Sequence, residues 1–159
     1  MPLKETDEYG LIRATRLAGG QIQRTDTKNA DGLVKEFGAY IRYNSDWKKW
    51  LAWNGEYWQT DEGEVQINEF VKKMVRGIYK NALYTSDYKE RIAIEKFAEE
   101  SESKRRINAC IDLASKRQEI QIKAADLDTN LMLLNVENGT VDLSTGEFRE
   151  HRPSDLSAR

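Results

Sequence analysis

Basic side chains concentrate in one stretch of the sequence, residues 103–123. Six lysines and arginines there face only Asp112 and Glu119, so the stretch carries +4 while the whole chain carries −2. Clustered cations bind nucleic acid through its phosphates, without regard to base sequence. A solvated helix face, or pairing with Glu99, Glu100 and Glu102 just upstream, would explain the same pattern. The candidate DNA contacts are Lys104, Arg105, Arg106, Lys116 and Arg117.

All four tryptophans lie between residues 47 and 58, next to Lys48 and Lys49. Aromatic side chains beside a basic track can stack on single-stranded bases. At alternating strand positions, however, large aromatic residues more often form a core. We expect one face of this segment to pack on helices and the other to meet the N-terminal residues or a partner. The candidate partner-binding residues are Trp47, Trp53 and Trp58.

The sequence lacks the motifs of common catalytic sites. It contains no G-x-x-x-x-G-K-[ST] loop, no G-x-G-x-x-G fingerprint and no G-x-S-x-G elbow. One cysteine, Cys110, and one histidine, His151, cannot form a Cys/His zinc site. Asp126, Asp128 and Asp142 could surround a divalent cation, but acids at such positions usually cap turns. We expect no catalytic residue, metal or cofactor in this chain, and a buried, unreactive Cys110.

Length and composition fit one charged domain. The chain has 159 residues, 33% of them charged and 39% hydrophobic. A single cysteine permits no intrachain disulfide, which suits a reducing compartment. No apolar run has membrane-spanning length, and the first ten residues are more polar than a signal peptide is expected to be. These features predict a soluble cytoplasmic protein.

Apolar spacing predicts three main helices and a short one. Asn29 could cap the short helix, which would end at Gly38. The i, i+3, i+4, i+7 pattern is strongest between Glu64 and Tyr84. The other two helices span about 87–100, with Ile92, Phe97 and Ala98 inward, and 103–118, with Ile107, Cys110, Ile111 and Ala114 inward.

Two Asn-Gly pairs predict β-hairpins. Asn54-Gly55 would form a two-residue loop that places Leu51 opposite Trp58. Asn138-Gly139 suits a type I′ turn within a C-terminal meander. The meander strands are expected at 131–136, 140–143 and 147–149, with a turn at Thr145-Gly146 and a further short strand at 120–123.

The expected fold class is therefore α+β, with a three-helix bundle flanked by small antiparallel hairpins from both ends of the chain. Residues 1–24 show no sustained period and are expected to form a flexible arm or docking segment. Residues 25–157 would form the domain itself.

A series of short motifs runs through the chain in a distinctive order. They are Thr25-Asp26-x-x-Asn29-Ala30, Ile41-Arg42-Tyr43 with Trp47-x-x-Trp50, Trp53-Asn54-Gly55 with Trp58-x-x-Asp61, Ser101-Glu102-Ser103, Leu133–Glu147 and His151–Asp155. Together they resemble the amino-terminal domain that precedes the superfamily 3 helicase in phage and plasmid replication proteins related to the poxvirus helicase–primase. The resemblance covers residues 25–157. Family members commonly carry glycine in place of Lys28 and Arg-Phe in place of Gly32-Leu33.

The resemblance implies a non-catalytic accessory domain of a replicative helicase, often primase-fused. It implies a downstream ATPase domain that uses ATP and Mg²⁺, a hexameric ring on single-stranded or forked DNA, a bacterial host cytoplasm and no membrane. The alternative is a protein-interaction module that binds a primase, a loader or the ATPase domain without touching DNA. A stand-alone small enzyme is the weakest of the three hypotheses.

Overall fold

The computed structural model describes residues 24–158, which divide into two compact units. The helical unit comprises the residues up to Glu36 together with Asn68–Ala114, and the β unit comprises Phe37–Ile67 and the residues from Ser115 onward. Each unit is therefore built from two separate stretches of chain. The predicted arm, residues 1–24, lies outside the described residues except for Arg24.

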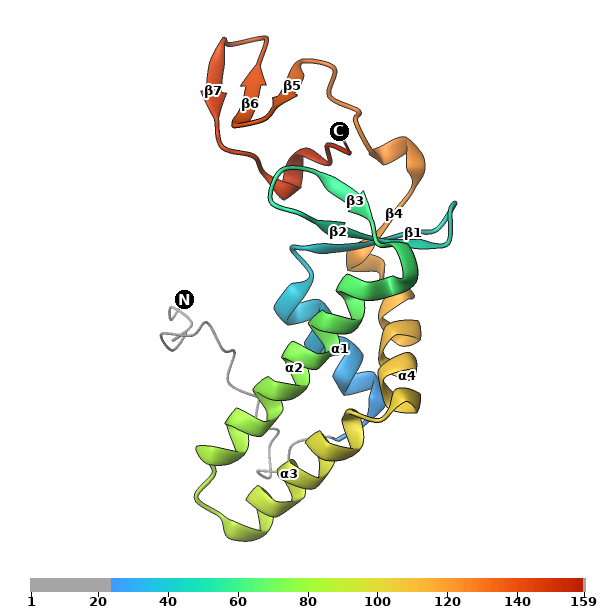
Figure 1. The fold of residues 1–159 in the computed structure, drawn as a ribbon, viewed down its shortest axis with the longest axis vertical. Helices are drawn as coiled ribbons and strands as arrows, with labels where there is room; N and C mark the ends of the chain where they lie inside the picture. The colour runs from blue at the N-terminus through green and yellow to red at the C-terminus, as the bar shows by residue number, and fades with distance from the viewer. Residues whose placement is uncertain (1–23, 159) are drawn as a thin grey trace. The chain divides into compact units, whose positions relative to one another are not determined.

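Four α-helices, labelled in Figure 1, form most of the helical unit. All four contribute buried side chains. The helices are α1 (Asp26–Phe37), α2 (Val65–Leu83), α3 (Tyr88–Ser101) and α4 (Lys104–Ser115). Because α1 buries Asn29, Ala30 and Leu33, the unit draws on four helices instead of the three main ones expected.

The predicted apolar faces are largely confirmed. On α2, Val71, Met74, Val75 and Ala82 are buried at the expected spacing. On α4, the buried residues include Cys110, Ile111 and Ala114. The expectation for α3 was wrong at one position, because Ile94 is buried with Phe97 and Ala98 while Ile92 is 45% exposed.

Helix starts follow local hydrogen bonding. Asp87 caps α3 by accepting from the Glu90 amide, and the Ser103 hydroxyl accepts from the Arg106 amide at the start of α4. The expected Asn29 cap was wrong: α1 begins at Asp26, and the Lys28 amide donates to the Thr25 hydroxyl.

Helix α4 ends three residues before the predicted Gln118. The Gln121 side-chain amide donates to the Ser115 carbonyl at 2.9 Å and satisfies the end of the helix. Arg117 is already extended, and a 3₁₀ turn, η2 (Gln118–Ile120), leads into the next strand.

The tryptophan segment forms a four-stranded sheet in the β unit, in the order β3-β2-β1-β4. Its strands are β1 (Ile41–Asn44), β2 (Lys49–Trp53), β3 (Trp58–Thr60) and β4 (Gln121–Ile122). β4 confirms the short strand expected near 120–123. It pairs in parallel with β1, which lies almost eighty residues earlier.

The predicted register of the β2–β3 hairpin was wrong by two residues. Trp53 lies opposite Trp58, and Leu51 lies opposite Thr60. The Asn54 side chain accepts hydrogen bonds from the Glu56 and Tyr57 amides, which closes a four-residue loop in place of a two-residue one. A shift of two leaves every side chain on its expected face.

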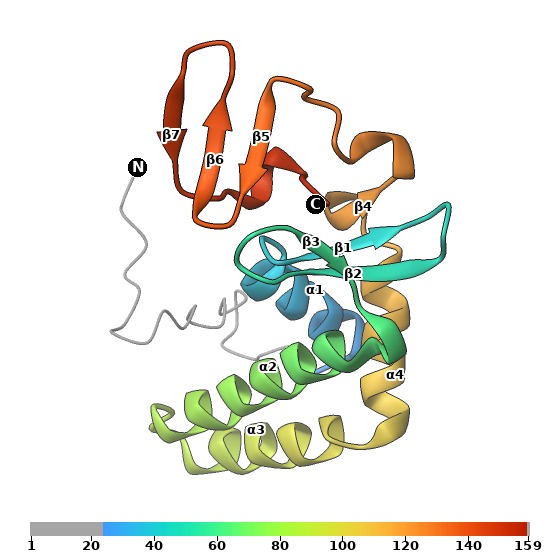
Figure 2. The same ribbon diagram turned by 45° about the horizontal axis from the view of Figure 1, so that its top comes forward.

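A second, three-stranded sheet in the β unit is the predicted C-terminal meander (Figure 2). It contains β5 (Leu133–Val136), β6 (Gly139–Asp142) and β7 (Glu147–Arg149). The predicted type I′ turn was wrong, because neither Asn138 nor Gly139 has a positive φ. Gly139 is the first residue of β6, paired with Val136. There a Cβ atom would lie 2.5 Å from the Arg149 carbonyl oxygen.

Short 3₁₀ turns complete the β unit, at η1 (Glu62–Glu64), η3 (Ala124–Asp126) and η4 (Pro153–Asp155). The α+β class is confirmed. Within residues 24–158, no helix combines the length and apolar character needed to cross a membrane.

Candidate nucleic-acid interface

The five basic residues predicted to contact DNA do not lie together on one unit. Lys104 and Arg105 occupy the first turn of α4 in the helical unit, and both are exposed. Lys116 and Arg117 follow that helix, belong to the β unit and have interaction partners of their own.

Arg106 is held by contacts within the helical unit. Its guanidinium lies 3.2 Å from Asp26 Oδ1 and 3.3 Å from Glu100 Oε2, and it covers the ring of Phe97 at 5.7 Å. One of these partners, Glu100, is among the acids that the sequence offered as the alternative to DNA. Arg106 therefore links α4 to the start of α1 and the end of α3.

A second basic surface, which the sequence analysis missed, lies on α2. We call it the α2 stripe; it consists of Lys72, Lys73, Arg76 and Lys80, all exposed. These positions are i, i+1, i+4 and i+8, which share one face of a helix. The helical period that identifies the apolar face of this segment also places these four cations on a single face, so the sequence contained the signal for the stripe.

Glu69 is the only acidic residue of α2, and it lies within the cationic face. Its carboxylate accepts from Lys72 Nζ at 2.7 Å. The pKa of Glu69 is lowered by this hydrogen bond first, by the charge of Lys72, and further by the charges of Arg76 and Lys73. The shift indicates that three of the four cations act on one point of the surface.

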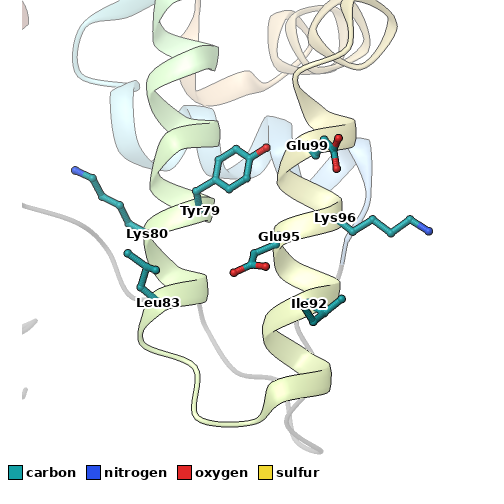
Figure 3. A pocket seen from close by; sticks show the side chains of 7 residues that line it. All are labelled: Tyr79, Lys80, Leu83, Ile92, Glu95, Lys96 and Glu99. Carbon is teal, nitrogen blue, oxygen red and sulfur yellow. The ribbon is translucent and has the colours of Figure 1, made fainter.

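A groove of about 470 Å³ separates α2 from α3 within the helical unit. Figure 3 shows Tyr79 and Glu95 lying between the two helices, whereas the ends of Lys80 and Lys96 point away from the groove on opposite sides. Leu83 and Ile92 are exposed apolar residues that line the groove; Ile92 is the residue of α3 that was expected to be buried. The pKa of Tyr79 is raised by desolvation first and then by the charges of Glu102 and Glu99. Acidic groups thus lie on the α3 side of the groove.

The three tryptophans expected to bind a partner differ in exposure. Trp58 is 1% exposed, and its indole donates to the Pro153 carbonyl at 2.9 Å. Trp53 packs edge-on against Trp58 at 5.7 Å and is partly buried. Trp47 is 49% exposed. Core packing therefore accounts for Trp58, and a partner-binding role fits Trp47 best.

The meander presents a further apolar surface in the β unit. Leu134, Val141 and Phe148 are directly paired across β5, β6 and β7, so their side chains share one face. Leu134 is 50% exposed and Phe148 is 54% exposed. Most apolar side chains of such a size are buried in folded domains, so this row is a candidate interaction surface.

The acidic residues considered as metal ligands accept hydrogen bonds from backbone amides. Asp126 accepts from the Lys123 amide, Asp142 from the Ser144 amide, and Asp128 from the Ala158 amide. Among residues 24–158, no group of three His, Cys, Asp or Glu side chains could hold a metal ion.

The histidine and the cysteine each have a structural setting. His151 Nδ1 lies 2.8 Å from Asn135 Oδ1, which also accepts from the Thr140 hydroxyl. Cys110 is 1% exposed, which confirms that it behaves as a small buried apolar residue. Burial first, and the charge of Asp26 second, raise the pKa of its thiol to about 12.

A comparison with family models finds a match. The model for "D5 N terminal like" domains matches residues 30–159. The chain belongs to the D5 N-terminal-like family. These are the N-terminal domains of D5-like phage and poxvirus helicase–primases, which confirms the resemblance. A comparison with curated proteins found no match.

Motifs that point to the D5 N-terminal-like family contact one another in the helical unit. The Asn29 side-chain amide donates to the Ser101 hydroxyl at 3.0 Å, which joins the first motif to Ser101-Glu102-Ser103. Both residues are buried. In this family member the two motifs therefore fix α1 to the end of α3.

Other motifs of the D5 N-terminal-like domain meet in the β unit. The closing motif supplies the Pro153 carbonyl to Trp58, and Asp155 forms a two-point ion pair with Arg149 at 2.8 and 2.9 Å. Asp61 accepts from the amides of Gln66 and Ile67 at the start of α2. These motif residues build the fold, whereas the α2 stripe lies outside the motifs.

Proposed function

We propose that this chain is a non-catalytic accessory domain of a DNA replication helicase–primase, acting in a bacterial host cytoplasm. It would aid ring assembly and help engage single-stranded or forked DNA beside an ATPase core that uses ATP and Mg²⁺. The observation that carries the proposal is the family match over residues 30–159, because D5-like N-terminal domains belong to replicative helicase–primases.

The described residues give this proposal physical support. The motif side chains Asn29, Trp58, Asp61 and Asp155 are committed to internal contacts. The exposed cations of α2 and α4 offer phosphate contacts. Such an arrangement suits a domain that positions DNA.

Fluorescence anisotropy with labelled single-stranded, duplex and forked DNA tests the DNA part of the proposal. We expect binding that weakens steeply with salt and is indifferent to base sequence, because phosphate contacts release counterions. Absence of binding to all three DNAs at low salt would exclude DNA engagement and favour the protein-interaction alternative.

The meander row favours that second candidate, a protein-interaction module. Leu134 and Phe148 are exposed apolar residues, and such residues are often buried when a subunit or partner binds. The residues around them could contact a primase, a loader, the ATPase domain or a neighbouring copy in a hexamer. Trp47 in the β1–β2 loop is a smaller alternative site.

Sedimentation velocity over a range of concentrations tests whether the meander row supports assembly. If it does, the chain self-associates and the Leu134→Ser/Phe148→Ser variant stays monomeric. The matched control is Leu83→Ser/Tyr84→Ser, since these residues of the helical unit are 67% and 79% exposed. Equal behaviour of the two variants would remove the meander row from ring assembly.

A further inference from the structure

Among the helices of residues 24–158, α2 has the largest net positive charge. Helix α2 carries four cations against one carboxylate, while α3 carries three cations against four carboxylates. Helix α4 carries three against one, but Arg106 is already paired with Asp26 and Glu100. Helix α2 therefore presents four exposed cations on one face, whereas α4 presents two, Lys104 and Arg105.

The spacing of the α2 stripe fits a phosphate backbone. From Lys72 to Lys80 the helix advances about 12 Å, at roughly 1.5 Å per residue. That length can span more than one phosphate of a strand, because a duplex carries one charge per roughly 3.4 Å of axis on each strand. A straight row of exposed cations can thus follow successive phosphates instead of meeting a single anion.

Neighbouring acidic groups indicate where the stripe is most positive. Glu95 and Glu99 line the groove on the α3 side, and the end of Lys80 points away from them (Figure 3). At the other end Lys72 is paired with Glu69, and Lys73 lies 5.4 Å from the ring of Phe70. Lys72, Lys73 and Arg76 all lie close enough to Glu69 to act on its charge, so they form the most compact group of cations in the stripe.

We propose that Lys72, Lys73 and Arg76 on α2 form a binding site for the phosphate backbone of DNA, with Lys80 at its end. This inference rests on the proposed DNA engagement and moves its main contact from the α4 cluster to α2. The site has no contact to base edges, so it does not select a sequence. A row of lysines and an arginine suits continuous phosphates better than the irregular carboxylates of an acidic protein.

The test compares three variants of the full chain in a DNA-binding titration at several salt concentrations. The first is Lys72→Gln/Lys73→Gln/Arg76→Gln. The matched control is Lys35→Gln/Lys89→Gln/Lys96→Gln, which removes the same charge from exposed positions of α1 and α3 in the same unit. The third is Lys104→Gln/Arg105→Gln. Far-ultraviolet circular dichroism verifies that each variant is folded.

We expect the α2 variant to bind single-stranded and forked DNA on the order of a hundredfold more weakly at about 0.1 M salt, with a log–log salt slope reduced by about 2. The control and the α4 variant should lose less than about threefold. An α2 variant that binds like the control, while the wild type binds DNA, would overturn this inference but leave the proposed function in place.

Two further outcomes are decisive. If the wild type binds no DNA, the proposed DNA engagement itself fails. If polyglutamate displaces DNA at equal charge concentration, the stripe is a surface for acidic protein and the proposal is overturned.

Discussion

At the scale of single residues, charged side chains can serve the fold. Arg149 and Asp155 illustrate this, because their side chains are only 15% and 11% exposed and form a two-point ion pair. The pKa of Arg149 is raised, chiefly by its hydrogen bond to Asp155. The pair ties β7 to the closing motif, whose Pro153 carbonyl accepts from Trp58.

We predict that Asp155→Ala destabilises the chain by about 2–3 kcal/mol, because it leaves a mostly buried guanidinium without its carboxylate. Arg149→Met/Asp155→Ala should recover part of the loss. Urea unfolding followed by tryptophan fluorescence measures both. Glu95→Ala is the control, since its exposed pair with Arg91 should contribute less than about 1 kcal/mol. Equal losses for Asp155→Ala and Glu95→Ala would contradict the buried ion pair.

Cys110 gives a prediction about pH. Its pKa is raised from 9.0 to about 12 in the folded chain, so folding favours the neutral thiol. The resulting stability is complete below pH 9 and is lost as pH rises toward 12. Between about pH 8 and pH 10.5, Cys110→Ala should therefore lose less stability than the wild type. Parallel loss in both proteins would show that the thiol ionises as readily folded as unfolded.

At the scale of elements, the sequence pattern predicted helix existence well and hairpin geometry less well. The apolar period of α2 is long enough to determine which face is buried. The start of α3 was also predictable, because Asp87 is a good N-cap residue and accepts from the Glu90 amide. The length and type of a turn depend on which of several competing local hydrogen bonds forms. Asn54 accepts from two backbone amides and lengthens its loop, which composition alone does not reveal.

Gly139 is a second case, because its role is close approach and not a positive φ. An added Cβ would meet the Arg149 carbonyl oxygen at 2.5 Å and the Phe148 ring at 2.6 Å. We predict that Gly139→Ala destabilises the meander by roughly 1–3 kcal/mol, measured by urea unfolding. Asn138→Ala should cost less than about 0.5 kcal/mol, as an exposed residue without positive φ. The reverse ranking would support the type I′ turn.

At the scale of the whole molecule, each of the two units is formed by two stretches that are far apart in the sequence. β1 pairs with β4 across almost eighty residues, and Asn29 bonds to Ser101 across 72. Local periodicity carries no information about such pairings, so the sequence predicted the elements and the α+β class but not their division. The same limit explains why Lys104–Arg106 and Lys116–Arg117 were grouped as one site although they belong to different units.

The central claim is that this D5 N-terminal-like domain engages DNA through exposed cations. The most direct measurement is the dependence of single-stranded DNA affinity on salt for the purified chain. Three phosphate contacts predict a log–log slope of about −2 and equal affinity for unrelated base sequences. An affinity that does not change with salt, or no binding at about 20 mM salt, would contradict the account.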